Sequence, residues 1–267
     1  MKLLFSEAAP DYEHYIFPYA IWGFPESGES PADFFEAGFL PSTRELDRFY
    51  LARHIRVRLR DFQASSENRR ILRKGASLKW TLLPREQFQL TEERRAFCKR
   101  YADARFGNEV MSESRLTTLF TSPVATHIMV FQENETRREV GYVVLYLESP
   151  RVAFYYYSFY DLTWFDRSLG LFLMTSAVDH FAREQFEHLY LGTCYSERAL
   201  YKTQFSGFEF FNGFRWSDNV QELKFLVNRQ SIKPGQHLLE SEEYRATYQR
   251  GEAPAQFAGG FRVLPGK

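Results

Sequence analysis

An arginine, a serine and a glycine stand together at the expected start of a helix, where residues of these types can bind an anion. The segment Arg167-Ser168-Leu169-Gly170 precedes a run of apolar residues at helical spacing. The first turn of a helix leaves backbone N–H groups unpaired, so it is a general site for phosphate groups. A glycine at a helix start is also common for structural reasons alone. The segment is therefore a candidate ligand site and, alternatively, a candidate helix cap.

Three strands and one helix are expected to position this segment. Two alternating apolar runs, Val140–Leu147 and Val152–Tyr157, predict neighbouring strands joined by a turn around Ser149-Pro150. Asp166–Glu184 has the spacing of a helix, and Leu189–Leu191 predicts a short buried strand.

This order of strand, strand, helix and strand resembles the core of the GNAT acyltransferases, in which the helix N-terminus holds a phosphate-bearing acyl donor. GNAT enzymes that use acetyl-CoA carry Gln/Arg-x-x-Gly-x-Gly/Ala there, whereas Arg167 and Gly170 are followed here by Phe172. The phenylalanine is expected to obstruct the approach of a pyrophosphate. The expected fold class is α/β (α+β), with a GNAT-like mixed sheet flanked by helices and a smaller N-terminal α+β domain.

Motifs of the same region, read together, resemble the catalytic half of the aminoacyl-tRNA–protein transferases, the arginyl- and leucyl-transferases that extend protein N-termini. In that family an aromatic strand ending in an aspartate precedes Ser-Leu-Gly. A Tyr-Leu-Gly strand, a Tyr-Lys pair and an acidic residue then follow. The matching residues are Tyr155, Tyr157, Asp161, Ser168, Leu169, Gly170, Tyr190, Leu191, Gly192, Tyr201, Lys202 and Glu209. With weaker likeness upstream, the resemblance extends over most of residues 10–216.

The chain departs from the family in its N-terminal segment. The family usually has a cysteine cluster there, including a Cys-x-x-Cys, that is thought to bind a metal or an iron–sulfur cluster. The matching stretch, Phe49–His54, has no cysteine, so no metal site is expected. The loop between Gly192 and Tyr201 is also shorter than is usual in the family, which bears on specificity more than on fold.

Basic residues concentrate in residues 44–79, which contain 11 Lys and Arg but only four Asp and Glu. Alternation in Phe49–Phe62 predicts a half-buried strand with an arginine-rich outer face, and Ser65–Lys74 predicts a basic helix. Such a stretch often marks only a solvated face, but it also suits the phosphates of a tRNA acceptor stem. The candidate tRNA-binding residues are Arg56, Arg58, Arg69, Arg70, Arg73 and Lys74.

Composition and charge limit the classes of function. The net formal charge is zero, which argues against indiscriminate binding to nucleic acid but permits a local basic face. Cys98 and Cys194 are too few for a disulfide framework, and Cys194 has no marked partner that would make it a nucleophile. Without an expected signal peptide or membrane span, we expect a cytoplasmic protein, a monomer, with no membrane partner.

The remaining elements are shorter. Helices are expected at Pro31–Ala37, Thr91–Phe106 and Ser112–Phe120, and strands at Ser77–Leu83, Thr126–Gln132 and Glu222–Val227. From about Gln230 the chain is polar and is expected to form a peripheral tail. The expected domains are residues 1–90 with the basic face, the GNAT-like catalytic residues 91–230, and the tail 231–267.

The family resemblance implies transfer of arginine or leucine from tRNA to the N-terminal α-amino group of a protein, one expected to begin with an acidic residue. Aminoacyl-tRNA is already activated, so no further cofactor is needed. The enzyme must align amine and ester, stabilise an oxyanion and protonate the departing ribose oxygen. The resemblance makes Tyr157, Asp161, Tyr201 and Lys202 catalytic candidates, and Tyr155, Arg167, Ser168, Leu169, Gly170 and Glu209 substrate-binding candidates.

Several alternatives stay open. A transferred arginine would need a carboxylate such as Asp161, Asp166 or Glu209, whereas leucine would need an apolar pocket, for which Phe172, Phe205 and Phe208 are candidates. Competing interpretations are an acetyl-CoA-dependent N-acetyltransferase and a non-catalytic homologue that binds tRNA or protein N-termini. Reversing the charges of Arg69 and Arg70 would cripple a tRNA-dependent enzyme and leave a CoA-dependent one nearly untouched.

Overall fold

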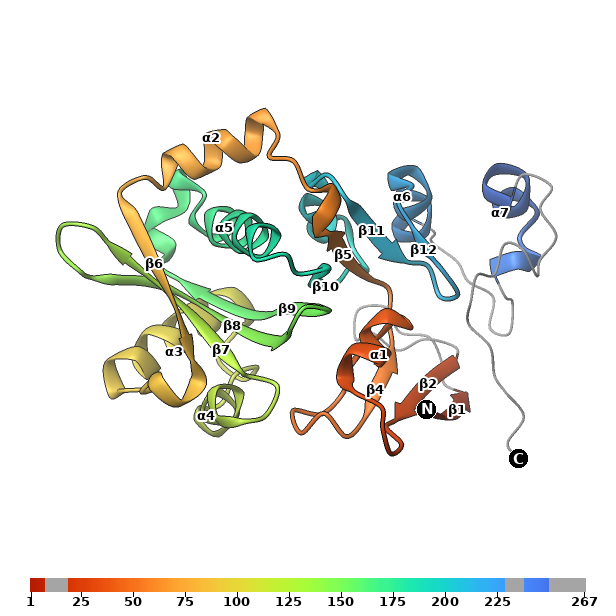
Figure 1. Cartoon of the computed structure of the whole chain (residues 1–267), viewed down its shortest axis with the longest axis horizontal. Coiled ribbons are helices and arrows are strands. Elements are labelled where there is room, and N and C mark those ends of the chain that lie inside the picture. The colour runs from red at the N-terminus through yellow and green to blue at the C-terminus, as the bar shows by residue number, and fades with distance from the viewer. Residues whose placement is uncertain (8–18, 229–237, 250–267) are drawn as a thin grey trace.

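An eight-stranded mixed sheet forms the centre of the molecule (Figure 1). The computed structural model describes residues 1–7, 19–228 and 238–249, and for residues 5–7, 19–20 and 165–167 it describes only the backbone. The strand order is β12-β11-β5-β10-β9-β8-β7-β6. The strands are β5 (His54–Arg58), β6 (Leu78–Pro84), β7 (His127–Glu133), β8 (Glu139–Glu148), β9 (Val152–Tyr160), β10 (His188–Thr193), β11 (Phe208–Phe211) and β12 (Trp216–Ser217).

Only β9 and β10 pair in parallel among the neighbouring strands described in this sheet; the other pairs are antiparallel. Helix α5 (Leu169–Arg183) connects β9 to β10, so the predicted order of strand, strand, helix and strand is confirmed. A large mixed sheet flanked by helices also confirms the expected α/β fold class.

Helices cover both faces of the sheet. Helix α2 (Ser66–Lys74) and α5 lie on one face, and α3 (Glu92–Phe106) and α4 (Glu113–Thr121) lie on the other (Figure 1). Side chains of β8 alternate between the two cores: Val143 and Leu145 pack toward α5, whereas Tyr142 and Val144 pack toward α3 and α4. Because successive side chains of a strand point to opposite faces, β8 is buried on both sides.

A second, four-stranded sheet lies at the N-terminal end. Its order is β1-β2-β4-β3, with β1 (Lys2–Glu7), β2 (Tyr19–Phe24), β3 (Phe39–Pro41), β4 (Phe49–Leu51) and the short helix α1 (Pro31–Glu36). This is the smaller N-terminal α+β unit, but it does not extend to residue 90. Strands β5 and β6 precede that residue and belong to the large sheet, as does the intervening helix α2 through its packing on α5.

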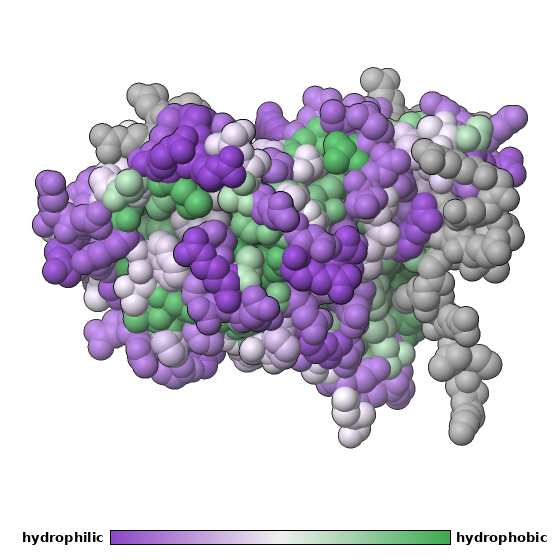
Figure 2. All heavy atoms as spheres, turned by 45° about the horizontal axis from the view of Figure 1, so that its top comes forward, coloured by the Kyte–Doolittle hydropathy of each residue, from purple (hydrophilic) through white to green (hydrophobic). Residues whose placement is uncertain are grey.

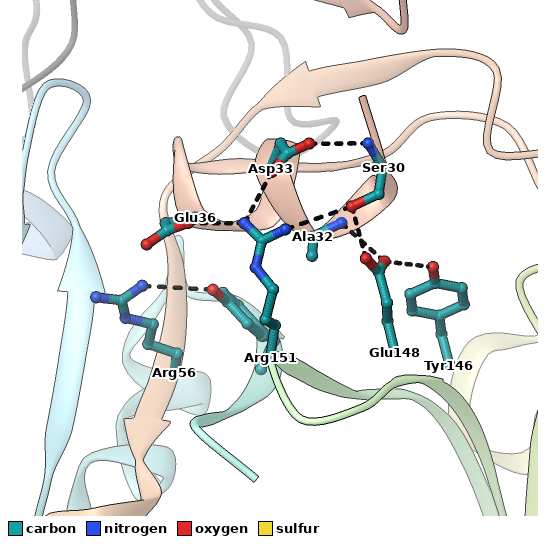
Figure 3. Close-up of polar contacts among 9 residues, drawn as sticks. Ser30, Ala32, Asp33, Glu36, Arg56, Tyr146, Glu148 and Arg151 are labelled. Atoms are coloured by element: carbon teal, nitrogen blue, oxygen red, sulfur yellow. Dashed lines mark hydrogen bonds and ion pairs between the residues drawn. The ribbon is translucent and has the colours of Figure 1, made fainter. Parts of the chain in front are cut away.

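Helix α1 is anchored to the turn between β8 and β9 (Figure 3). The carboxylate of Glu148 accepts a hydrogen bond from Ser30 Oγ at 2.5 Å and from the Ala32 backbone N–H at 2.9 Å. Arg151, on the same turn, pairs with Asp33 at 2.8 Å. Glu148 therefore caps the N-terminus of α1, and the N-terminal unit is attached to the large sheet at this turn.

Helix starts agree closely with the sequence. Thr91 and Ser112 accept hydrogen bonds from the third residue of α3 and α4, and Ser65 does so for α2. These caps satisfy N–H groups that have no partner within the helix.

Two expectations near the C-terminal end were wrong. Residues 222–227 belong to helix α6 (Val220–Asn228), in which Leu223 and Leu226 are buried at helical spacing. The segment after Gln230 is not wholly peripheral, because Tyr244, in the short helix α7 (Glu242–Tyr244), is completely buried and donates a hydrogen bond to Glu222 at 2.5 Å. Residues 229–237 and 250–267 of the expected tail lie outside the described residues.

Candidate active site

The two parallel strands of the large sheet separate after three residue pairs. Strands β9 and β10 pair from Val152 and His188 to Phe154 and Tyr190, and no pairing between them is present beyond that point in the described chain. Each strand has a bulge just past the separation, at Tyr156 in β9 and at Leu191 in β10. A bulge bends its strand, so the two edges diverge and leave backbone groups facing a gap. We call this gap the splay.

The bulge in β9 decides which face of the sheet each tyrosine occupies. Simple alternation would place Tyr155 and Tyr157 on one face, but they lie on opposite faces, because the extra residue Tyr156 shifts the pattern. Tyr155 packs toward α5, and its buried hydroxyl has no hydrogen-bond partner among the described residues. Tyr157 packs toward α3 and α4, where burial raises its pKa to about 12. Tyr155 and Tyr157 therefore lie on opposite faces of the sheet beside the splay.

Lys202 and Tyr201 lie at the β10 side of the splay, on the short helical segment η4 (Glu197–Gln204). Lys202 Nζ donates a hydrogen bond to the Thr193 carbonyl at 3.0 Å, and a Cβ atom on Gly192 would lie 3.9 Å from this nitrogen. Burial lowers the pKa of Lys202 to about 8. About half of the Tyr201 surface is exposed, at 49%.

Tyr155 and Tyr201 are neighbours on the α5 side of the sheet. Burial is the main cause that raises the pKa of Tyr155, and the nearby phenol groups of Tyr201 and Tyr160 add to the rise. Tyr155 thus lies on β9 and Lys202 contacts the end of β10, the two strands that border the splay.

The start of α5 shows a structural role for its glycine. A Cβ atom on Gly170 would lie 2.6 Å from the ring of Tyr160, so the glycine makes room for that ring. Ser168 precedes the helix in the left-handed conformation, with φ of 54°, and Leu169 is buried in the core. The side chain of Arg167 lies outside the described residues.

The phenylalanines expected near a ligand are core residues instead. Phe172 does not obstruct the helix start; it is buried beside α2, where a Cβ atom on Gly75 would lie 2.1 Å from its ring. Phe205 and Phe208 are also buried in the core on the α5 side. None of the three lines the cavity beside Asp161 or the cavity between the splayed strands, both described below, and their expected role in a leucine pocket stays a prediction.

Asp161 lies beside a separate cavity of about 780 Å³ next to α3. Its carboxylate pairs with Arg138 at 2.8 Å and accepts hydrogen bonds from the Thr163 N–H and hydroxyl at 2.9 and 2.7 Å. These partners lower the pKa of Asp161 although burial opposes them. Arg138 and Thr163 therefore hold the Asp161 carboxylate in place, and its expected catalytic role stays a prediction. The side chain of Asp166 lies outside the described residues.

Arg56 and Glu209 form a buried ion pair, which corrects the expected exposed face at Arg56. Arg56 Nε lies 2.8 Å from Glu209 Oε2, and the guanidinium carbon lies 3.8 Å from the centre of the Trp216 ring. Arg58 binds the other oxygen of Glu209 at 3.0 Å. Strand β11 pairs with β5, and Trp216 covers Arg56, so the outer face that alternation predicted is enclosed at this position.

Helix α2 carries the exposed part of the predicted basic surface. Arg69, Arg70, Arg73 and Lys74 are all exposed, and Arg70 pairs with Glu67. Figure 2 turns the side of α2 and α5 toward the viewer, and hydrophilic side chains cover much of that face, with hydrophobic surface between them. Because α2 packs on α5, the basic face lies over the helix that joins the splayed strands.

A cavity of about 590 Å³ lies between the splayed strands, α4 and the N-terminal sheet, and we call it the splay pocket. Its lining consists of Ile21, Trp22, Leu40, Pro41, Ser42, Arg44, Tyr50, Leu51, Met111, Arg115, Leu119, Phe154, Tyr156, Tyr157, Gly192 and Thr193. Sequence reasoning selected only Tyr157 from this set as a site residue. Arg44 lies in the basic stretch and Tyr156 in the aromatic run, but no local pattern distinguishes them from their neighbours.

The described part of the chain has neither a candidate metal cluster nor a helix suited to the membrane interior. No group of three His, Cys, Asp or Glu side chains is placed to bind a metal ion in residues 1–7, 19–228 and 238–249. None of the helices in these ranges has the length and apolar character that a membrane span requires.

Comparison with known structures gives only weak likeness. The C-terminal domain of a putative lysylphosphatidylglycerol synthetase from Agrobacterium fabrum is 15% identical, with a TM-score of 0.42 over 54% of this chain and 46% of that one. A GCN5-related glucosamine N-acetyltransferase region of a fungal β-N-acetylglucosaminidase is 11% identical, with a TM-score of 0.41 over 73% of this chain and 23% of that one.

Comparison with known sequences is more informative, although no family model matches. Aspartate/glutamate leucyltransferases are 24% identical in Cereibacter sphaeroides, 28% in Rhodospirillum rubrum and 31% in Methylorubrum extorquens. The matches cover 61%, 61% and 57% of this chain and 60%, 67% and 65% of the relatives. The chain thus spans about 60% of the length of the first of these proteins. These matches confirm the resemblance drawn from the sequence motifs: the chain is similar to aspartate/glutamate leucyltransferases over about 60% of its length.

Proposed function

We propose that this protein transfers leucine from leucyl-tRNA to the α-amino group of an acceptor protein that begins with aspartate or glutamate. The names of the matched relatives favour leucine over arginine and favour an acidic acceptor. The observation that carries the proposal is the splay, a gap between two parallel strands that is bordered by Tyr155 on β9 and by Lys202, which donates to the Thr193 carbonyl at the end of β10.

The splay suits aminolysis of an ester. The neutral α-amine attacks the ester carbonyl carbon, a C–N bond forms, and the bond from that carbon to the ribose oxygen breaks. The proton lost by the amine balances the proton gained by the ribose oxygen. N–H groups on the separated edges of β9 and β10 supply donors for the oxyanion, as in other acyl transfers. In this proposal Lys202 or Tyr201 donates the proton to the ribose oxygen.

The exposed face of α2 is the proposed contact for the tRNA backbone. Among the described residues, Arg69, Arg73 and Lys74 have no carboxylate partner, whereas Arg70 is paired with Glu67. This replaces the wider surface expected from the sequence, because Arg56 is enclosed. Phosphate contacts fix the position of a nucleic acid without reading its sequence.

No further cofactor is part of the proposal, because the tRNA ester brings its own activation. The competing acetyl-CoA interpretation is disfavoured by the start of α5, where the ring of Tyr160 occupies the space beside Gly170. In an acetyl-CoA enzyme the pyrophosphate would need that space.

A transfer assay on the purified protein tests the proposal. Radiolabelled leucyl-tRNA and arginyl-tRNA are supplied separately with peptides that begin with Asp, Glu or Ala. We expect label from leucyl-tRNA on the Asp and Glu peptides. Lys202→Met should lower kcat by about 10²- to 10⁴-fold, whereas the control Tyr248→Phe, at a hydroxyl bonded to the Gln221 carbonyl, should not. No label from either tRNA, together with a thermal shift caused by acetyl-CoA, would overturn the proposal.

A further inference from the structure

Among the described residues, the lining of the splay pocket carries positive charge and no negative charge. Arg44 and Arg115 are its charged side chains in these ranges, and none of the described lining residues is aspartate or glutamate. Arg44 Nε is buried and lacks a hydrogen-bond partner in the described parts of the chain. Arg115 donates to the Val110 carbonyl at 2.8 Å rather than to a carboxylate. A buried guanidinium nitrogen without a partner is unusual, because desolvation of a charged donor is costly unless an acceptor compensates it.

The cavity next to α3 provides a contrast within the same molecule. Three arginines and three acids of the described residues line it, and two of the arginines are paired: Arg94 with Glu139 at 2.7 Å and Arg138 with Asp161 at 2.8 Å. That cavity therefore has internal charge balance, whereas the splay pocket has a surplus of positive charge that a bound anion would neutralise.

Two phenol groups add donors beside the arginines. Burial raises the pKa of Tyr156 and Tyr157, and the positive charge of Arg115 opposes the rise in both cases. Arg44 also acts on Tyr156, by charge and by a hydrogen bond. Both phenols are thus protonated donors close to the guanidinium groups. Guanidinium and phenol donors together match a carboxylate, which accepts hydrogen bonds on both oxygens.

The same cavity reaches the reacting end of the splay. Gly192 and Thr193 line it, and the Thr193 carbonyl accepts the hydrogen bond from Lys202. An amino acid residue in the pocket can therefore present its α-amine at the splay while its side chain points toward the arginines. Trp22, Leu40 and Leu119 supply apolar walls for the aliphatic part of such a residue.

We propose that the splay pocket holds the N-terminal residue of the acceptor protein, and that Arg44 and Arg115 bind the side-chain carboxylate of its aspartate or glutamate. This assignment rests on the aminoacyl transfer proposed above and names the residues that select its acceptor. A lysine or arginine at the acceptor N-terminus would be repelled by the two guanidinium groups. An asparagine or glutamine has the same shape but lacks the charge that the pocket balances.

Peptides that differ only in their first residue, Glu or Gln, test the inference. The kcat/KM for transfer from leucyl-tRNA is measured for both peptides with the wild type, Arg44→Gln, Arg115→Gln and the double variant. The ratio between the two peptides is taken on one protein preparation, so a partly misfolded variant does not distort it. Arg137→Gln, in the exposed turn between β7 and β8, is the control.

We expect each arginine substitution to lower kcat/KM for the Glu peptide by about 10- to 100-fold and to leave the Gln peptide unchanged. Binding of tRNA, measured separately by filter retention, should not change. If both variants keep the wild-type ratio of Glu to Gln, the pocket assignment is overturned while the transfer reaction stands. If the wild type labels no peptide at all, the proposed function fails, and the assignment fails with it.

Discussion

Replacing Glu209 with alanine is expected to destabilise the protein by about 3–5 kcal/mol, because it leaves a buried arginine without its counter-charge. The side chains of Arg56 and Glu209 are 9% and 10% exposed, and their closest atoms are 2.8 Å apart. Arg56 would keep its contacts with the Tyr190 hydroxyl at 3.3 Å and with the Trp216 ring, but neither carries a negative charge.

The other partner of Glu209 adds little to this figure. Arg58 is 34% exposed, and it also pairs with Asp61, so water and that carboxylate compensate for the loss of Glu209. Glu209→Gln keeps the shape and one acceptor, and should cost less than the alanine variant. Replacing both members, as Arg56→Met with Glu209→Leu, should bring stability back near the wild-type value, because the desolvation of both charges is removed with the pair.

Urea unfolding at neutral pH measures these differences, and a thermal melt should show a decrease of roughly 10 °C in Tm for Glu209→Ala. Glu92→Ala removes an ion pair whose carboxylate side chain is 93% exposed, and this control should change stability by less than about 1 kcal/mol. A Glu209→Ala variant as stable as the wild type, but inactive in transfer, would refute the structural role and support the substrate-binding role that the family resemblance implied.

Three further predictions concern other parts of the molecule. Glu148→Ala removes the acceptor at the start of α1 and should cost about 1–2 kcal/mol, seen as faster hydrogen exchange in α1 than in α3. The pKa of Lys202 is about 8 in the folded protein, below its value in the unfolded chain. Between about pH 8 and 10 the unfolded state therefore binds more protons, and the free energy of unfolding should rise with pH. Urea unfolding at several pH values should show this rise in the wild type and not in Lys202→Met. Charge reversal at Arg69 and Arg73 should weaken tRNA binding and reduce the slope of log affinity against log salt by about one for each lost contact, whereas Arg183→Glu at the far end of α5 should leave the slope unchanged.

The parts of the fold that follow from local pattern were predictable. The apolar runs of β8 and β9, the helical spacing of α5 and the serine and threonine caps each depend on residues close together in the chain. Their order was enough to predict the strand, strand, helix, strand core and, with the motifs, the family. Tyr201 and Lys202 were selected through the family resemblance, and they do lie at the splay.

The parts that depend on distant packing could not be predicted. Arg56 looked exposed because alternation describes one strand alone, and the pairing with Glu209 joins residues that are 153 positions apart. The apolar pattern in α6 is too short to distinguish a helix from a strand, and the packing partners of this segment are distant in the sequence. The bulge at Tyr156 leaves no mark in the residue types around it, so the faces of Tyr155 and Tyr157 could be assigned only from the structure.

That bulge also bears on which kinds of sequence change this protein can accept. The extra residue in β9 produces the bulge, whatever type that residue is. Deleting Tyr156 would leave Tyr155 and Tyr157 on their present faces but would remove the bulge that bends β9 at the splay, whereas a substitution of Tyr156 would leave the bulge in place. Descendants of this chain should therefore vary in residue type along this stretch while its length stays constant, and a gain or loss of one residue there should mark a protein with a different site.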